Sequence, residues 1–194
     1  MSKGISKYHY YLLNKPFGYL CQFSGESTDL LLGELYDFPK DVYSIGRLDK
    51  DSEGLLMLTN DNTYKTMLLD PKSNKTKTYW VQVEGKITEE AIIELGSGTL
   101  SISHKGTKHK VKLAECSRLK APNIEERNPP IRSRKSIPTS WISIILTEGK
   151  NRQIRKMTAA VGFATLRLIR VKLDDHSLDG LKPGEVRSFV PINR

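Results

Sequence analysis

The residues from Gly46 to Leu55 are the stretch of this chain whose types and spacing most plainly suggest chemistry. They read Gly-Arg-Leu-Asp-Lys-Asp-Ser-Glu-Gly-Leu, so that two glycines enclose an arginine and three acids. An apolar run with strand character follows at once, and this order would hold a carboxylate at the edge of a sheet. Arg47 could bind such a carboxylate bidentately. The simplest interpretation is a charged surface turn, and the alternative is a loop that presents one reactive carboxylate.

The flanking sequence predicts the elements that must position this loop. Alternating and β-prone segments predict strands, and segments that begin at a capping residue and end at a glycine predict short helices. Asp61, for example, is well placed to cap a helix directly after the apolar run. We expect strands at 8–13, 19–23, 55–59, 76–85, 110–119, 141–146, 166–173 and 186–192, and helices at 28–35, 63–69, 88–95 and 151–161. Many strands with few short helices favour an α+β fold with a largely antiparallel sheet.

Length and composition fit a folded protein of modest size. The chain has 194 residues, of which 38% are hydrophobic and 27% charged, and its mean hydropathy is −0.44. This suits one domain, or one domain built from two lobes. Cys21 and Cys116 lie far apart without ligand-like neighbours, so we expect reduced thiols and a cytoplasmic protein. The first residues do not resemble a signal peptide, and no apolar run approaches a membrane span.

The net charge of +9 is unevenly distributed. Residues 104–156 contain fourteen Lys and Arg against four acids, and the rest of the chain is close to neutral. A basic excess confined to about a quarter of the sequence favours a surface that meets a polyanion, most often nucleic acid. A solvated charged surface without a partner is the alternative.

The segment 46–56 resembles the signature loop of the pseudouridine synthases, written G-R-L-D-x-D-(S/T)-x-G-L-L in the RsuA-type branch. The resemblance implies that Asp49 is the catalytic carboxylate. It also implies the catalytic fold of that family: an α+β fold of two lobes, with a largely antiparallel mixed sheet, short helices and a central RNA-binding cleft. A magnesium or hydrolase site at the three acids is disfavoured, because Arg47 and a basic helix further along fit a lone reactive carboxylate better.

Two shorter strings resemble further motifs of the family. Residues 14–18, Asn-Lys-Pro-Phe-Gly, resemble K-P-x-G, which implies that Lys15 supports the catalytic loop. Residues 77–81 resemble K-x-Y-x-V, which implies that Tyr79 stacks on the target base and takes part in proton transfer. An aromatic residue with a hydroxyl suits both tasks. On its own, Tyr79 would be interpreted as a core residue.

The segment 146–157 resembles E-G-(K/R)-N-R-Q-(I/V)-R-(R/K)-M. The resemblance implies that Arg155 pairs with Asp49, and that Lys150 and Arg152 contact phosphates together with Arg47. On the expected helix 151–161, Arg152 and Arg155 would share a face close to its electropositive start. Residues 166–170 resemble the strand that places a leucine beneath the base, and we assign this role to Leu168.

The expected organisation is a single catalytic domain over 1–194 without the S4-type RNA-binding domain that precedes it in most of the branch, because K-P-x-G already begins at Lys15. Residues 122–138 contain four prolines and read as an irregular loop. They resemble the basic proline-rich insertion of a subfamily that acts on large-subunit ribosomal RNA. We expect Arg132, Arg134 and Lys135 to contact RNA there.

The implied reaction converts a specific uridine in 23S ribosomal RNA to pseudouridine. The base must leave its helix and be held between an aromatic and an apolar side chain, while a carboxylate acts near C1′ and C2′. Asp49 could be a nucleophile or a base, and the residues leave both routes open. No cofactor and no metal are expected, and a monomer is. The alternative is a non-catalytic factor that binds ribosomal RNA or assists ribosome assembly.

Overall fold

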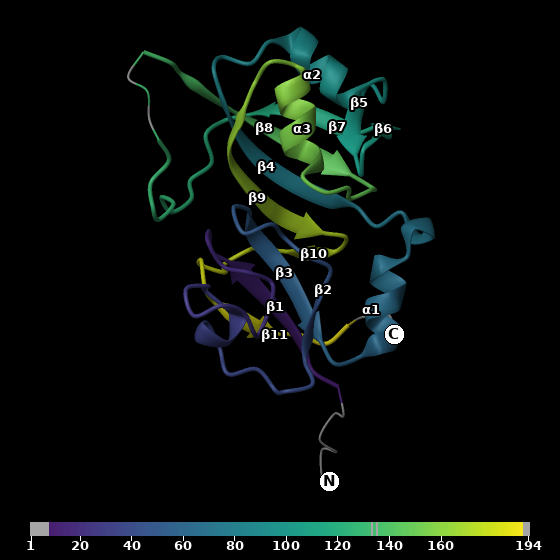
Figure 1. Cartoon of the computed structure of the whole chain (residues 1–194), viewed down its shortest axis with the longest axis vertical. Coiled ribbons are helices and arrows are strands. Elements are labelled where there is room, and N and C mark those ends of the chain that lie inside the picture. Colours follow the sequence, from purple (N-terminus) through teal and green to yellow (C-terminus); the bar gives the residue numbers. More distant parts are fainter. Residues whose placement is uncertain (1–7, 133, 135, 192–194) are drawn as a thin grey trace. The chain divides into compact units, whose positions relative to one another are not determined.

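The computed structural model describes residues 8–132, 134 and 136–191. The chain divides into two compact units (Figure 1). Unit 1 consists of residues 1–73 together with 178–194, and unit 2 consists of residues 74–177. Unit 1 therefore needs both ends of the chain, whereas unit 2 is one continuous segment.

Unit 1 contains four antiparallel strands. β1 (Tyr10–Lys15) lies between β11 (Val186–Ser188) and β3 (Glu53–Thr59), and β2 (Tyr43–Ile45) also pairs with β3. Every residue of β1 and β3 is buried. Because side chains alternate along a strand, one set from both strands meets on the same face. That face forms the core of unit 1 with Tyr11, Leu13, Leu56 and Leu58.

Helix α1 (Asn62–Leu69) follows β3 directly and confirms the helix expected there. The Asp61 carboxylate accepts hydrogen bonds from the backbone amides of Thr63 and Tyr64, at 3.0 and 3.1 Å. These bonds satisfy donors that a helix start leaves without partners. The buried Tyr10 hydroxyl donates to the same carboxylate at 2.7 Å, so the cap also ties α1 to β1.

Unit 2 contains a sheet in the order β9, β4, β8, β7, with every neighbouring pair antiparallel. The short β10 extends β9 as a hairpin, and β5 and β6 form a separate hairpin. Helices α2 and α3 supply apolar residues to one core with this sheet. The bounds are β4 Lys77–Glu84, β5 Ser101–His104, β6 Thr107–Lys110, β7 Glu115–Leu119, β8 Thr139–Leu146, β9 Thr165–Leu173, β10 His176–Ser177, α2 Glu89–Gly96 and α3 Gln153–Ala160.

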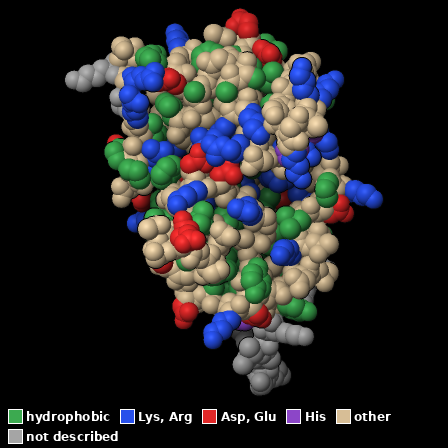
Figure 2. Space-filling model, in the orientation of Figure 1, with side chains coloured by type: hydrophobic (Ala, Val, Ile, Leu, Met, Phe, Trp, Pro, Cys, Tyr) green, Lys and Arg blue, Asp and Glu red, His purple; other side chains and the backbone are tan. Residues whose placement is uncertain are grey.

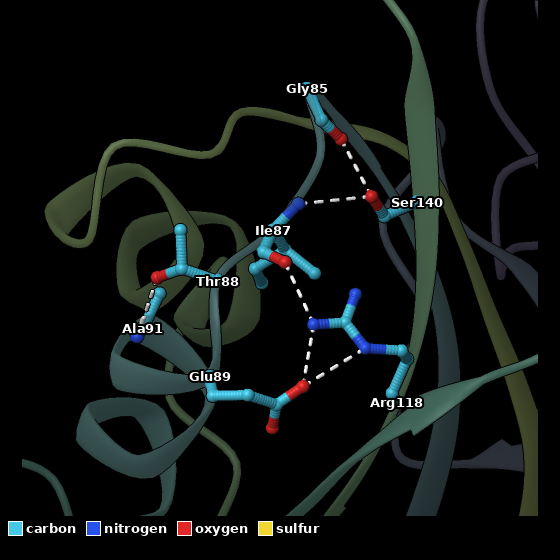
Figure 3. A network of polar contacts seen from close by, with 7 residues as sticks. All are labelled: Gly85, Ile87, Thr88, Glu89, Ala91, Arg118 and Ser140. Carbon is cyan, nitrogen blue, oxygen red and sulfur yellow. Dashed lines mark hydrogen bonds and ion pairs between the residues drawn. The ribbon is translucent and has the colours of Figure 1, made fainter.

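A polar network fixes the start of α2 against the sheet (Figure 3). The Arg118 guanidinium on β7 donates to the Glu89 carboxylate at 2.6 and 3.1 Å and to the Ile87 carbonyl at 2.9 Å. The Ser140 hydroxyl on β8 donates to the Gly85 carbonyl and accepts from the Ile87 amide. Thr88 caps the helix by accepting from the Ala91 amide. Strand and helix are therefore joined by an ion pair and by bonds that satisfy the backbone groups of Gly85, Ile87 and Ala91.

Two expected elements of unit 1 are wrong. Residues 19–23 form no strand. The Leu20 amide donates to the Leu30 carbonyl and the Leu32 amide to the Gln22 carbonyl, and these bonds amount to one isolated bridge, from Tyr19 to Leu30. The helix expected at 28–35 shrinks to the 3-10 turn η1, Leu32–Glu34. A second such turn, η2 (Pro71–Ser73), follows α1.

One expected strand of unit 2 is two elements. The stretch 110–119 alternates like a strand, but Lys110 is the last residue of β6, residues 111–114 form no strand, and only 115–119 join the larger sheet as β7. The Val111 amide bonds to the Leu100 carbonyl and the Ala114 amide to the Gly96 carbonyl, so this connection follows the end of α2. The strands β2, β5 and β10, and β6 apart from Lys110, were not expected from the sequence. The α+β class with a largely antiparallel sheet is confirmed. Among the described helices, none has the length and apolar character needed to cross a membrane.

Candidate active site

The loop that carries Asp49 connects β2 to β3 in unit 1. Leu48 is buried in the core of that unit, and both of its backbone groups engage Cys21. The Leu48 amide donates to the Cys21 sulfur at 3.2 Å, and the Cys21 thiol donates to the Leu48 carbonyl at 3.4 Å. The Asp49 carbonyl then accepts from the Ser52 amide at 3.0 Å, which closes a turn. Asp49 is therefore held half-buried one residue beyond an anchored leucine, whereas Arg47 is exposed.

Lys15 lies beneath this loop. It ends β1 opposite Gly54, is fully buried, and donates to the carbonyls of Pro16 and Tyr19 at 2.9 and 2.7 Å. Burial lowers the pKa of its ammonium to about 8, although Cys21 and the acids of the loop, Asp49 among them, oppose that shift. A buried cation thus lies within the electrostatic field of the loop acids. This is the geometry a supporting residue needs.

Tyr79 and Leu168 lie on neighbouring strands of unit 2. In the register of β4 with β9, Leu168 lies opposite Val81, two residues along from Tyr79. Residues two apart on a strand share a face, so the tyrosine ring and the leucine are diagonal neighbours on one face of the sheet. Leu168 is buried, and Tyr79 is partly buried against the same core. The arrangement brings together the two residues expected to hold a base.

Arg170 was missed by sequence reasoning. It lies directly opposite Tyr79 on β9 and only 4% of it is exposed. Its charge also helps, after burial, to lower the pKa of Lys77. A buried guanidinium beside the expected base-stacking residue is unusual for a strand interior. The expected strand 166–173 contains two arginines, Arg167 and Arg170, which could have been noted as candidate site residues. Alternation alone, however, does not show which residues of a strand are buried.

A network at Glu148 fixes the segment that leads into α3. The carboxylate accepts from the Lys112 amide at 3.0 Å and from the Gln153 side chain at 2.7 Å, and it pairs with His109 at 3.0 Å. Burial would raise the pKa of Glu148, but these hydrogen bonds outweigh it and lower the pKa. Gln153 accepts in turn from the Lys150 amide at 2.9 Å. The start of α3 is thus held from both sides.

The predicted basic residues around α3 do not share one helical face, and that expectation is wrong. α3 begins only at Gln153, and Arg152 precedes it in a left-handed conformation with φ of 53°. Arg152 is exposed, while Arg155 is half-buried in the first turn and its guanidinium approaches the Thr165 carbonyl at 3.4 Å. Lys150 is half-buried in the loop before them. Only Arg155 of the two arginines therefore belongs to the helix.

The described part of segment 122–138 is irregular, as expected. Arg132 and Arg134 are exposed, and Arg134 pairs with Glu84 at 3.4 Å. The buried Arg167 guanidinium donates to the Glu125 carbonyl at 2.9 Å, which attaches the segment to β9. The expected RNA contact at Lys135 lies outside the described residues.

The candidate site residues thus come from both units. Unit 1 supplies Lys15, Arg47 and Asp49, and unit 2 supplies Tyr79, Leu168 and the basic residues. Within the described ranges, no group of three or more His, Cys, Asp and Glu side chains is arranged to hold a metal ion.

Comparison with known proteins gives consistent results. The family model described as RNA pseudouridylate synthase matches residues 9–160. The chain is 46% identical to ribosomal large subunit pseudouridine synthase E of Xanthomonas campestris pv. campestris, covering 91% of this chain and 92% of that protein. It is 45% identical to the protein of the same name from Vibrio parahaemolyticus, covering 90% and 71%. A crystal structure of a pseudouridylate synthase superposes with a TM-score of 0.76 at 26% identity, covering 96% of this chain and 72% of that one.

Proposed function

The chain belongs to the RNA pseudouridylate synthase family, and from that premise we propose that it converts one uridine of large-subunit (23S) ribosomal RNA to pseudouridine with Asp49 as the catalytic carboxylate. It is an RNA pseudouridine synthase of the RsuA type. The relatives named for large-subunit ribosomal RNA support the choice of substrate. The choice of Asp49 is supported by the structure of its loop. Cys21 is hydrogen-bonded to both the amide and the carbonyl of Leu48, the residue before Asp49.

The reaction is an isomerisation in which no atom is lost from the substrate. The bond from N1 to C1′ breaks, the uracil rotates, and a bond from C5 to C1′ forms, after which the proton leaves C5 and N1 carries a hydrogen. No electrons are exchanged with another molecule, so we propose a reaction without cofactor or metal. A carboxylate beside C1′ and C2′ acts either as a nucleophile at C1′ or as a base towards C2′.

Positioning is the second requirement, because a base inside a helix is out of reach and must be extruded. In our proposal the Tyr79 ring stacks on the extruded uracil and Leu168 supports it from the adjacent strand. The Arg155 guanidinium pairs with the Asp49 carboxylate and keeps it ionised and oriented. Lys15 supports the loop through its positive charge, which acts on the loop acids, Asp49 among them.

The remaining basic residues would hold the RNA backbone. Phosphate contacts set the register of a bound nucleic acid without reading its sequence. We assign this role to Arg47, Lys150, Arg152, Arg132, Arg134 and Lys135. Since ribosomal RNA is made and modified in the cytoplasm of bacteria, we place the enzyme there, acting as a monomer.

Release of tritium from RNA labelled at C5 of uridine tests the assignment of Asp49. We expect release from large-subunit ribosomal RNA with the wild type and a loss of at least a thousandfold in rate with Asp49→Asn, because that change removes the charge and keeps the shape. Asp51→Asn is the matched control in the same loop and should retain most of the activity. Equal rates for the wild type and Asp49→Asn would remove Asp49 from the mechanism. Release only from transfer RNA would keep the chemistry and overturn the substrate.

A further inference from the structure

The β5–β6 hairpin in unit 2 has two unlike faces. A two-residue turn of Lys105 and Gly106, with φ of 49° and 77°, joins the strands, and Ser101 lies opposite Lys110. Since side chains alternate, Ile102, His104 and His109 occupy one face, and that face meets α3 and Glu148. The opposite face carries Ser101, Ser103, Lys108 and Lys110, all of them exposed. Two lysines and two serines therefore make up the solvent-facing side of the hairpin, and Thr107 is exposed on the other side at the turn.

A third lysine follows shortly after the strand. Val111 is buried and bonds through its amide to the Leu100 carbonyl, and Lys112 next to it is exposed, as Lys108 and Lys110 are. We call these three residues the lysine row. Neighbouring members are two residues apart, which is roughly 7 Å along an extended chain. That spacing is comparable with the separation of successive phosphates along one nucleic-acid strand.

Acids are missing from this stretch. Between Leu100 and Ala114 the chain has four lysines and two histidines but no Asp or Glu. The nearby Glu148 is engaged with His109, Gln153 and the Lys112 amide. Burial lowers the pKa of His104, and the charges of Lys150, Lys105 and Lys156 lower it further. Figure 2 shows Lys and Arg side chains over the side of unit 2 that carries β5 and β6.

A surface groove of about 650 Å³ lies at the end of the row. Lys110 and Lys112 line it together with Ser97, Gly98, Asn74 and Thr147. Ammonium groups, hydroxyls and an amide are the donors that phosphate and ribose oxygens accept from. Val111 and the exposed Leu113 also line the groove, so its preference for a sugar–phosphate backbone comes from the ammonium groups of Lys110 and Lys112.

The hairpin is also tied to the candidate active site. Lys156 of α3 donates to the Ser103 carbonyl of β5 and to the Asn151 carbonyl, both at 2.9 Å. His109 of β6 binds the carboxylate that fixes the start of α3. RNA bound at the hairpin would therefore contact an element that is hydrogen-bonded to α3, the helix that carries Arg155.

We propose that the lysine row and its groove bind the phosphate backbone of an RNA segment outside the target nucleotide, and so help to select large RNA substrates. This inference rests on the proposed function, since it concerns the substrate of the same enzyme. The row was not among the residues expected from the sequence to contact RNA.

The test compares two triple variants in an Asp49→Asn background, where RNA is bound without turnover. One carries Lys108→Ala, Lys110→Ala and Lys112→Ala. The matched control carries Lys40→Ala, Lys72→Ala and Lys86→Ala, which remove the same charge from exposed positions elsewhere. The probe is a protein-free fragment of large-subunit ribosomal RNA, and filter binding is followed from 50 to 300 mM salt.

We expect at least a tenfold rise in Kd for the lysine-row variant. The slope of log K against log salt should fall in magnitude by about two, because each phosphate contact contributes roughly 0.7 to 0.9 to that slope. The control should change neither by more than a factor of about two.

Equal affinity and slope for the two variants would overturn the proposal. A defect seen only with protein-containing ribosomal particles would also overturn it, in favour of a protein partner. A variant with three Lys→Gln changes repeats the measurement if circular dichroism shows that the alanine variant is misfolded. Failure of the proposed function is separate: it would appear as no tritium release by the wild type, whatever the lysine-row variant binds.

Discussion

Lys15 is a cation whose side chain is fully buried in unit 1. Its ammonium donates to the carbonyls of Pro16 and Tyr19, and burial lowers its pKa to about 8. The folded protein therefore holds this proton less tightly than the unfolded chain, in which the pKa is near 10.5. The burial of the charge opposes folding at neutral pH, and this cost disappears as the residue becomes neutral in both states.

We predict a stability difference that depends on pH between the wild type and Lys15→Met. The unfolding free energy of the wild type should rise relative to the variant as pH increases from about 8 to about 10.5, by up to roughly 3 kcal/mol, because the unfolded state binds more protons in this window. Urea unfolding at several pH values measures it, and the other groups cancel in the comparison. A constant difference across the window would show that Lys15 keeps its ordinary pKa.

At the scale of elements, Cys21 fixes the backbone of the loop that carries Asp49. Its sulfur accepts a hydrogen bond from the Leu48 amide, and its thiol donates to the Leu48 carbonyl, one residue before Asp49. We predict that Cys21→Ala lowers the rate of tritium release roughly tenfold or more, because a carboxylate that moves loses its orientation. Stability should fall by only about 1 kcal/mol, the net worth of an ordinary hydrogen bond. Cys21→Ser restores a donor and an acceptor and should recover most of the rate. An alanine variant with the full rate would show that these hydrogen bonds have no role in catalysis.

The irregular segment 122–138 connects two strands that pair with each other. β7 and β8 pair from Glu115 with Ile145 to Leu119 with Trp141, so the two ends of the segment start from neighbouring strands. We predict that replacing 122–138 by a short Gly-Ser linker leaves the circular dichroism spectrum unchanged and raises KM for ribosomal RNA roughly tenfold, with a smaller effect on kcat. A linker of the same length as the segment, with its arginines and lysine replaced by serine, separates charge from length. An unchanged KM in both would end the assignment of this segment to RNA binding.

At the scale of the whole molecule, unit 1 is discontinuous and unit 2 is not. β11 returns to pair with β1, so unit 1 is complete only when the last part of the chain has been added. The charge is divided in the same way, because residues 104–156, which carry the basic excess, belong entirely to unit 2. One unit therefore carries the candidate reactive carboxylate, and the other carries most of the charge that would attract RNA.

Local sequence signals predicted those elements that local interactions form. Asp61 and Thr88 cap the helices expected after them, because a cap involves only the next three residues. The segments 19–23 and 110–119 were wrong because alternation cannot reveal whether a neighbouring strand is available. The prediction that Arg152 and Arg155 share a helical face was wrong because the bonds of Gln153 with Glu148 and with the Lys150 amide fix where α3 begins.

The sequence by itself determined the family and singled out Asp49, because the residues that carry the chemistry stand in short continuous strings. Only the tertiary structure decided which charged residues are buried. Lys15 lies fully within unit 1 and Arg170 lies opposite Tyr79, whereas the lysine row faces solvent. Burial and strand register depend on partners far along the chain, and they set both the pKa of a group and the surface that RNA can reach. The sequence was sufficient to identify the loop 46–54, but the hydrogen bonds between Cys21 and Leu48 form only in the folded chain.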